Sequence, residues 1–217
     1  MKTATKNGSG NSTFDVLSNV SNDGEFAIST SVPYRVEVEI TGNSDFLFHR
    51  WSCDEVEAKA KAAKGSAAKK SDNLESYVYR CDDGTLGIPG EYLRQAIAGK
   101  NGAAKYRQDP RSARKSALDL FKAGVVSLTE VASLGVEDWD RVDRRRVCIQ
   151  ASSITRERPA MRTGWKVTFI LMVLVPEYIS PSILADVIAD AGRLVGVGDF
   201  RPTYGRFAMT RFEVLKD

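Results

Sequence analysis

A chain of 217 residues, 42% hydrophobic and 27% charged with a net charge of +3, has the composition of a globular protein with one core and is neither strongly basic nor strongly acidic. Its longest apolar run, Phe169 to Pro176, is far shorter than the roughly 18 residues that cross a bilayer, and its polar N-terminus lacks the apolar stretch of a signal peptide. We therefore expect a cytoplasmic protein without a membrane partner, in which Cys53, Cys81 and Cys148 are free thiols.

The first part of the chain predicts one strand between two irregular segments. Residues 1 to 32 are rich in Ser, Asn, Thr, Gly and Lys, and we expect a disordered N-terminal tail there. From Tyr34 to Ile40 every second residue is apolar, which is the period of a half-buried strand. The Ala- and Lys-rich residues 54 to 72 begin with a helical pattern. They predict a flexible insertion, at about 52 to 76.

From residue 77 onwards the patterns predict alternating strands and helices. Asp82, Asp83 and Gly84 are typical of a hairpin turn. Helices are predicted at 89–100, 112–123 and 180–196, and strands at 144–154, 165–175 and 206–214. Without the insertions, the second of them at about 100 to 165, the order is strand, helix, strand, strand, helix, strand. This predicts an α+β, ferredoxin-like or RNA-recognition-motif-like domain over residues 33–217.

The charge is segregated along the chain. Residues 100 to 122 hold seven basic and two acidic residues, a sum of +5, and residues 141 to 166 hold eight basic and two acidic, a sum of +6. The rest of the chain therefore sums to −8. Such segregation is typical of a polyanion bound along one face. A pair of solvated helix or hairpin faces is the alternative interpretation.

Three segments, taken in chain order, carry a family resemblance. They are the strand from Tyr34 through Gly42 with Phe46-Leu47-Phe48-His49-Arg50, the helix entry Leu86-Gly87-Ile88-Pro89-Gly90-Glu91-Tyr92-Leu93-Arg94-Gln95-Ala96-Ile97, and the glycine-rich stretch Gly192 to Phe207 that ends Tyr204-Gly205-Arg206-Phe207. In this order they resemble the RAMP superfamily, the RNA-recognition-motif-like backbone subunits that coat guide RNA in CRISPR effector complexes. Glu91-Tyr92 and Gln95 depart from the usual helix entry of that family.

The resemblance implies a ferredoxin-like palm with an inserted thumb. It further implies head-to-tail assembly of copies along single-stranded RNA, other effector subunits as partners, and a place in antiviral defence or in a phage or mobile-element relative. The residues suggest the same ligand, because the planar guanidinium fork donates two hydrogen bonds to a phosphate. The predicted function is a sequence-tolerant, single-stranded RNA-binding backbone subunit.

The candidate nucleic-acid-binding residues come from the two basic segments and from the three segments of the resemblance. They are His49, Arg50, Arg94, Lys100, Lys105, Arg107, Arg111, Arg144, Arg146, Arg156, Arg158, Met161, Arg162, Gly196, Gly198, Arg201, Tyr204 and Arg206. Residues 156–165 read as a basic loop, in which an exposed Met161 would be a wedge between bases. Trp165 is expected to pack in the core.

Three other functions remain open at this point. The chain could be a structural or protein-interaction subunit, or a single-stranded DNA-binding protein. It could also be a metal-dependent endoribonuclease using His49, Asp54 or Asp199. Because His49 is the only histidine and no paired ligand spacing is present, we expect no enzyme, no metal site and no cofactor.

Overall fold

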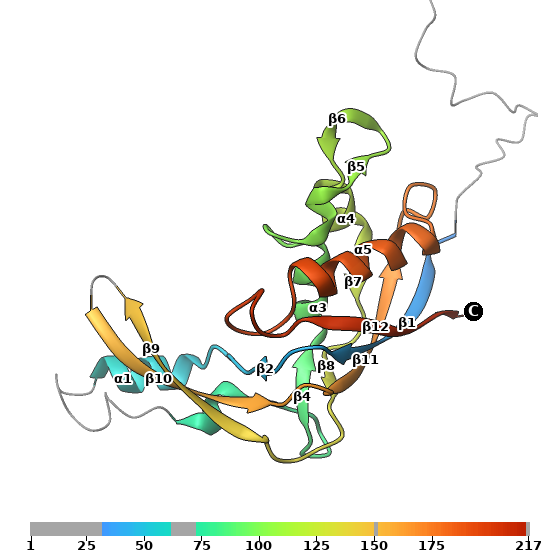
Figure 1. Ribbon diagram of the computed structural model, residues 1–217. Helices are drawn as coiled ribbons and strands as arrows, with labels where there is room; N and C mark the ends of the chain where they lie inside the picture. The colour runs from blue at the N-terminus through green and yellow to red at the C-terminus, as the bar shows by residue number, and fades with distance from the viewer. Residues whose placement is uncertain (1–31, 62–72, 150–151, 216–217) are drawn as a thin grey trace, which may run out of the picture. The chain divides into compact units, whose positions relative to one another are not determined.

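The central sheet of the computed structural model has four antiparallel strands, here called the palm sheet (Figure 1). Its spatial order is β12 (Phe207–Leu215), β1 (Tyr34–Gly42), β11 (Lys166–Val173) and β7 (Val125–Ser127). The structure describes residues 32–61, 73–149 and 152–215. The predicted tail and part of the first predicted insertion lie outside these residues.

Two helices stand between the palm strands in the chain and fix the topology. The helix α3 (Gly90–Ala98) follows β1 and precedes β7, and α5 (Pro181–Leu194) joins β11 to β12. Counting palm strands along the chain, the spatial order is fourth, first, third, second. This is the ferredoxin-like order of a βαββαβ unit. The predicted α+β, ferredoxin-like class is confirmed.

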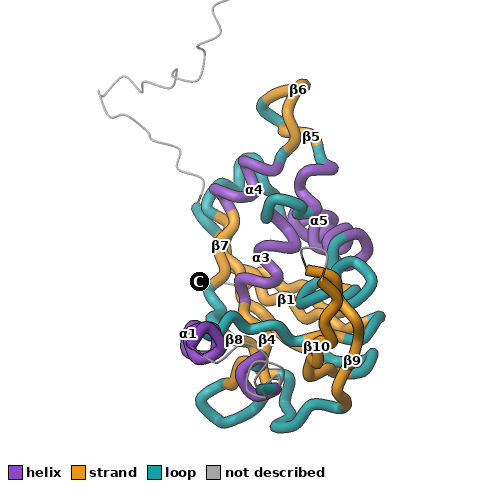
Figure 2. The backbone as a smooth tube through the Cα atoms, turned by 90° about the vertical axis from the view of Figure 1, so that its left-hand side faces the viewer, coloured by secondary structure: helices purple, strands orange, loops and turns teal. Residues whose placement is uncertain are grey.

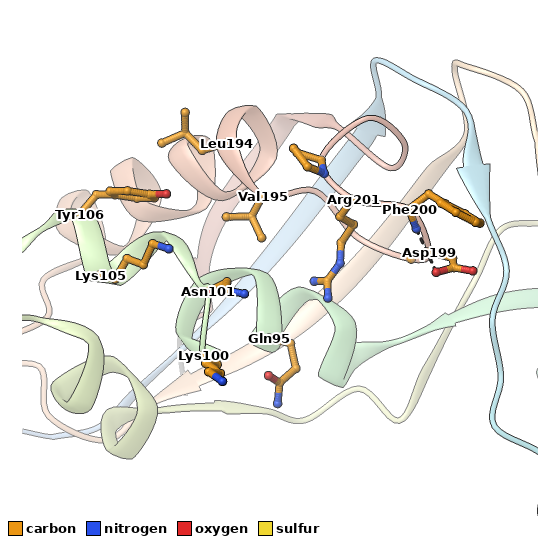
Figure 3. A pocket seen from close by; sticks show the side chains of 13 residues that line it. Gln95, Lys100, Asn101, Lys105, Tyr106, Leu194, Val195, Asp199, Phe200 and Arg201 are labelled. Carbon is orange, nitrogen blue, oxygen red and sulfur yellow. Dashed lines mark hydrogen bonds between the residues drawn. The ribbon is translucent and has the colours of Figure 1, made fainter. Parts of the chain in front are cut away.

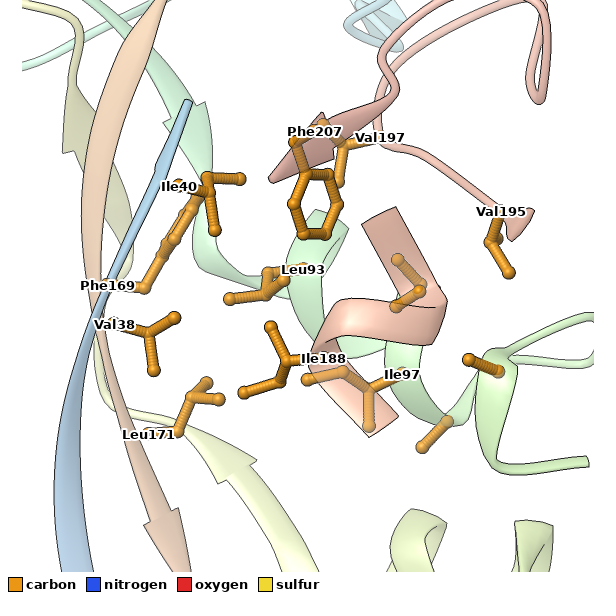
Figure 4. Packing of buried hydrophobic residues seen from close by; sticks show 14 of the residues in the cluster. Val38, Ile40, Leu93, Ile97, Phe169, Leu171, Ile188, Val195, Val197 and Phe207 are labelled. Carbon is orange, nitrogen blue, oxygen red and sulfur yellow. The ribbon is translucent and has the colours of Figure 1, made fainter. Parts of the chain in front are cut away.

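The core lies between the palm sheet and these two helices. Alternate residues of β1 are buried, and Val38 pairs with Phe169 of β11 across the sheet. Figure 4 shows Leu93 of α3 and Ile188 of α5 facing these strand residues, with the buried Ile97 of α3 beside Ile188. The period of two in the strands and of nearly four in the helices thus brings their apolar sides together.

The open face of β1 and β11 is polar and carries paired charges. Glu37 pairs with Arg211 of β12, and Glu39 lies 3.5 Å from the ammonium of Lys166. The residues that alternate with the buried ones on these two strands include no aromatic side chain. This face therefore differs from the aromatic-bearing sheet with which RNA-recognition motifs stack bases.

Further elements surround the palm. They are β2 (Phe46–Leu47), α1 (Cys53–Lys61), the 3-10 helices η1 (Leu74–Tyr77) and η2 (Ala103–Tyr106), β3 (Tyr79–Arg80), β4 (Leu86–Pro89), β5 (Gln108–Asp109), β6 (Ser112–Ser116), α4 (Leu118–Gly124), β8 (Val131–Ser133), β9 (Arg141–Ile149) and β10 (Ser152–Met161). Figure 2 shows β5–β6 and β9–β10 as separate hairpins. Within the described residues, no helix is both long and apolar enough to span a membrane.

Three predicted elements differ in the structure. The helix expected at 112–123 is a strand, β6, for its first five residues, because their exposed Ser-Ala-Arg-Lys-Ser sequence has no apolar side to bury. The strand expected at 144–154 belongs to the β9–β10 hairpin, and the second palm strand is β7. The basic loop expected at 156–165 is strand β10 as far as Met161, since Ala160 and Met161 pair with β2.

Candidate nucleic-acid interface

A groove runs between the C-terminal end of α3 and the segment that follows α5. It consists of a wide cavity of about 590 Å³ and a narrow one of about 260 Å³, which share Gln95, Gly198, Asp199 and Arg201 in their walls. The wide cavity is lined on the other side by Gly99, Lys100, Asn101, Lys105 and Tyr106. Figure 3 shows the side chains around it. We call residues 195–206 the glycine loop.

The sequence of the glycine loop explains its shape. Ser180 caps α5 by accepting the N–H of Ile183, and Gly196 ends the helix with a φ of +75°, a conformation that L-residues with side chains rarely adopt. Gly198 also has a positive φ, and a Cβ there would lie 2.5 Å from the ring of Phe46. The loop therefore packs backbone directly against β2.

The groove presents three basic side chains. Lys100 and Lys105 come from the segment after α3, and Arg201 extends from the glycine loop toward α3 (Figure 3). The ammonium of Lys105 lies 4.9 Å from the ring centroid of Tyr106. No ion pair joins these three cations to any residue of the described ranges. The carboxylate in the same wall, Asp199, is paired with Arg158, so the uncompensated charge of the groove is positive.

Arg158 fastens the β9–β10 hairpin to the glycine loop. Its side chain is 8% exposed and lies 2.9 Å from the carboxylate of Asp199. The guanidinium also stacks 4.6 Å from the ring centroid of Tyr77. Because the Arg158 side chain is buried and both of its partners belong to the protein, it holds the hairpin and the glycine loop together and does not lie on the surface of the groove.

A second arginine also joins the β9–β10 hairpin to the glycine loop. Arg145 of β9 lies 4.7 Å and 4.5 Å from the ring centroids of Phe200 and Tyr204. It also donates a 2.7 Å hydrogen bond to the hydroxyl of Tyr204 and pairs with Asp143. Tyr204, a predicted binding residue, is therefore held by the hairpin.

Several predicted arginines bind other parts of the protein. Arg94 donates hydrogen bonds to the carbonyls of Val125 and Lys122 and pairs with Glu91. Arg107 lies 2.7 Å from Asp190, Arg111 2.8 Å from Asp109, and Arg144 3.2 Å from Glu157. Much of the charge counted in the two basic segments is thus balanced locally.

The remaining candidates are distributed over different elements. Arg146, Arg162 and Arg206 are exposed, and Arg206 donates to the carbonyl of Pro202. Arg156 is half-buried on β10. The structure therefore brings Lys100, Lys105, Gly198 and Arg201 together at the wide cavity, with His49 beside the narrow one, and it does not bring Arg144, Arg146 and Arg162 to the same wall.

The expectation that Met161 is exposed is wrong. Its side chain is 6% exposed, because β10 pairs with β2 and places Met161 opposite Phe46 in the core. Burial excludes it as a wedge between bases. The predicted burial of Trp165 is confirmed, and its indole N–H donates to the carbonyl of Ser44.

His49 lies at the narrow end of the groove. Its ring stacks on Tyr77 with centroids 6.0 Å apart, and its carbonyl accepts the hydroxyl of Tyr92. Burial lowers the pKa of His49 below its ordinary 6.5, and the nearby Arg158 and Arg156 lower it further, while Asp199 opposes them. The imidazole is therefore neutral at pH 7 and adds no positive charge to the groove.

This lowered pKa predicts a loss of stability in mild acid. The unfolded chain takes up a proton at His49 near pH 6.5, whereas the folded protein does so at lower pH. The free energy of unfolding should therefore decrease as the pH falls from about 7 to about 5.5. Urea unfolding at both pH values measures this. A His49→Gln variant should lack this decrease, and equal pH dependence in the two proteins would contradict the assignment.

The acidic candidates for catalysis do not form a common site. Asp54 is exposed on α1, and Asp199 is paired with Arg158. Among the residues that the structure describes, no three His, Cys, Asp or Glu side chains are placed to hold one metal ion.

The sequence does not predict several residues of the groove, nor one carboxylate that anchors neighbouring segments of the fold. Gln95, Asn101, Tyr106 and Phe200 line the wide cavity. Tyr106 could have been predicted from the sequence, because it is an aromatic residue next to Lys105 in a basic segment, a combination typical of single-strand binding. The anchor is Asp45, which accepts from Arg141 and from Thr163. Its partners are 96 and 118 residues distant in the chain, so no local pattern points to it.

The palm sheet and its two helices place the chain in the ferredoxin-like class of α+β proteins. No family model matches the sequence, and no curated protein matches it. Among solved structures, the chain is similar to one in the type III-B Cmr-beta complex bound to cognate target RNA, with 16% identity and a TM-score of 0.45 over 85% of this chain and 61% of that one. It is also similar to a chain of the Csm3–Csm4 subcomplex of the type III-A CRISPR-Cas interference complex, with 12% identity and a TM-score of 0.34 over 84% and 77%.

Proposed function

We propose that this chain is a non-catalytic subunit that binds single-stranded nucleic acid, RNA in preference to DNA, along the groove. The observation that supports the proposal is the meeting of three basic side chains that form no ion pair within the described residues, Lys100, Lys105 and Arg201, with the exposed ring of Tyr106 in one cavity of about 590 Å³. Cations that follow a backbone and rings that stack on bases are the two elements of sequence-tolerant single-strand binding.

The phosphates would be held by side chains. The N–H groups of Val197 and Asp199 in the glycine loop donate to the carbonyls of Gly205 and Leu47. They are therefore already used within the protein and do not form the open backbone nest of a phosphate-binding loop. Lys100, Lys105 and Arg201 carry the charge instead, and binding should depend strongly on salt.

The resemblance to RAMP backbone subunits supports a further part of the proposal. Copies of the chain would lie head to tail along the strand, with other effector subunits as additional partners. Sedimentation of the protein with strands of increasing length tests this, because the particle should grow with the strand.

The affinity is expected to fall by about tenfold or more when Lys105 and Arg201 are both replaced by alanine. Fluorescence anisotropy with a labelled oligonucleotide of about 12 nucleotides measures it, at salt concentrations of about 50 to 200 mM. Each contact with a single-stranded phosphate contributes about 0.7 to the slope of log affinity against log salt, so the slope should decrease by about 1.4.

A double variant of equal charge is the control. Lys166→Ala with Arg211→Ala also removes one lysine and one arginine, but on the open face of the palm sheet. It should bind like the wild type. A flat salt dependence of the wild type, or equal losses in both double variants, would reject the groove as the binding site and favour a protein-interaction role. Cleavage of the labelled RNA in the presence of magnesium would reject the non-catalytic part.

A further inference from the structure

Trp51 is the most exposed tryptophan of the chain. Of the three tryptophans, Trp165 is buried and Trp139 packs against the core, whereas 68% of Trp51 is exposed. Leaving an indole in water forgoes a large favourable burial. A single exposed apolar residue is common, so exposure alone does not indicate a binding role for Trp51. Its position relative to the groove is the evidence for such a role.

The backbone before Trp51 is held in place although it has no regular secondary structure. The N–H of Phe48 donates to the carbonyl of Pro159, the carbonyl of His49 accepts the Tyr92 hydroxyl at 2.8 Å, and the N–H of Arg50 donates to the carbonyl of Tyr77 at 2.9 Å. The three residues before Trp51 are thus each tied to a different element. The indole leaves an ordered backbone, so less freedom is lost when it binds a ligand.

The surroundings of Trp51 connect it to the groove. His49, two residues earlier, lines the narrow cavity together with Tyr92. Arg50 is exposed, and its guanidinium lies 5.5 Å from the ring centroid of Tyr79, which in turn packs edge to face on Tyr92. Contacts between rings therefore connect the narrow cavity to Arg50, the residue that directly precedes Trp51 in the chain.

We propose that Trp51 is a base-stacking platform that extends the groove beyond His49. Its ligand is an unpaired nucleobase of the bound strand, and Arg50 contacts the adjoining phosphate. The inference rests on the proposed function and adds to it a stacking residue and a direction for the strand, from the wide cavity past the narrow one to Trp51.

Two variants of Trp51 test the proposal. Trp51→Ala should weaken the binding of a labelled oligo(A) of about 12 nucleotides by about tenfold, the loss expected when one stacked base is released. Trp51→Phe should retain most of the affinity, because it keeps a ring. The slope of affinity against salt should not change in either variant, since the indole carries no charge. Neither substitution removes a core residue, and thermal unfolding checks that both variants are folded.

Tryptophan fluorescence provides a direct readout. Stacking on a base should quench the emission of the wild type when unlabelled oligo(A) is added, and the Trp51→Phe protein should show no such quenching. If Trp51→Ala binds as tightly as the wild type while the Lys105 and Arg201 double variant is impaired, the platform is wrong and the proposed function stands. If Trp51→Ala and the Lys105 and Arg201 double variant both bind like the wild type, the stacking platform and the proposed function are both wrong. If Trp51→Ala instead changes sedimentation of the protein without nucleic acid, the indole is a contact between copies and the proposal is overturned.

Discussion

Gly205→Ala is expected to lower the free energy of unfolding by about 2 to 5 kcal/mol. Gly205 has a φ of +70°, and a Cβ at this position would lie 1.7 Å from the carbonyl oxygen of Val197. The same glycine donates its N–H to the carbonyl of Asp45 and accepts the N–H of Val197. An alanine would therefore suffer an unfavourable backbone conformation and push apart the two sides of the glycine loop. Urea unfolding measures the loss.

Gly84→Ala is a control that separates the cost of the backbone conformation from the cost of the steric clash. Gly84 has a φ of +84°, but no atom lies within 4 Å of a Cβ placed there. This control should lose only the conformational part, about 1 to 2 kcal/mol. Equal destabilisation by the two substitutions would mean that the close approach of Gly205 and Val197 contributes nothing. Gly205→Ala should in addition weaken nucleic-acid binding, whereas Gly84→Ala should not.

Arg158→Ala is expected to destabilise the protein by roughly 2 to 3 kcal/mol, less than a fully buried pair because Asp199 remains 27% exposed. Removing the guanidinium leaves this carboxylate without its partner in the wall of the groove and removes the stacking contact with Tyr77. The glycine loop should then be less firmly held against the β9–β10 hairpin. Urea unfolding gives the stability, and hydrogen exchange of residues 197–205 reports the loosening of the loop.

Arg144→Ala is the matched control for Arg158. Arg144 lies on the neighbouring strand and pairs with Glu157 at 3.2 Å, but its side chain is 72% exposed. An exposed pair contributes about 1 kcal/mol or less. If Arg158 were a phosphate contact on the surface, its removal would cost as little stability as that of Arg144 and would reduce the salt dependence of binding. That result would overturn the structural role assigned to Arg158.

The elements that the sequence predicted well are those with long, regular patterns. In β1 and β11, eight or more residues alternate between the core and the open face, and α5 has a capping serine, a first-turn proline and a terminal glycine. These patterns depend only on residues close together in the chain, so they can be recognised without knowledge of the fold. Strand β7 has three residues, too few for a period to appear, and the longer alternating pattern at 144–154 predicts a palm strand that the structure instead places in the β9–β10 hairpin.

The candidate site was predicted less well, because the role of an arginine depends on its partner. Arg158 and Arg201 are both basic residues near glycines or prolines in the sequence, but the first finds Asp199, 41 residues away, and the second lies in the cavity wall. Met161 was misplaced for a related reason. The surrounding stretch is basic, with Arg156, Arg158 and Arg162, while the position of Met161 is decided by the pairing of β10 with β2.

The position of β1 at the centre of the palm sheet has a consequence for folding. Its two neighbours, β11 and β12, begin 132 and 173 residues after Tyr34. During synthesis β1 therefore has no partner on either side until the ribosome has made most of the chain. Pairings of such long sequence separation slow folding and leave an apolar strand exposed for longer. We expect the palm sheet to form late and cooperatively, after the chain as far as β12 has emerged.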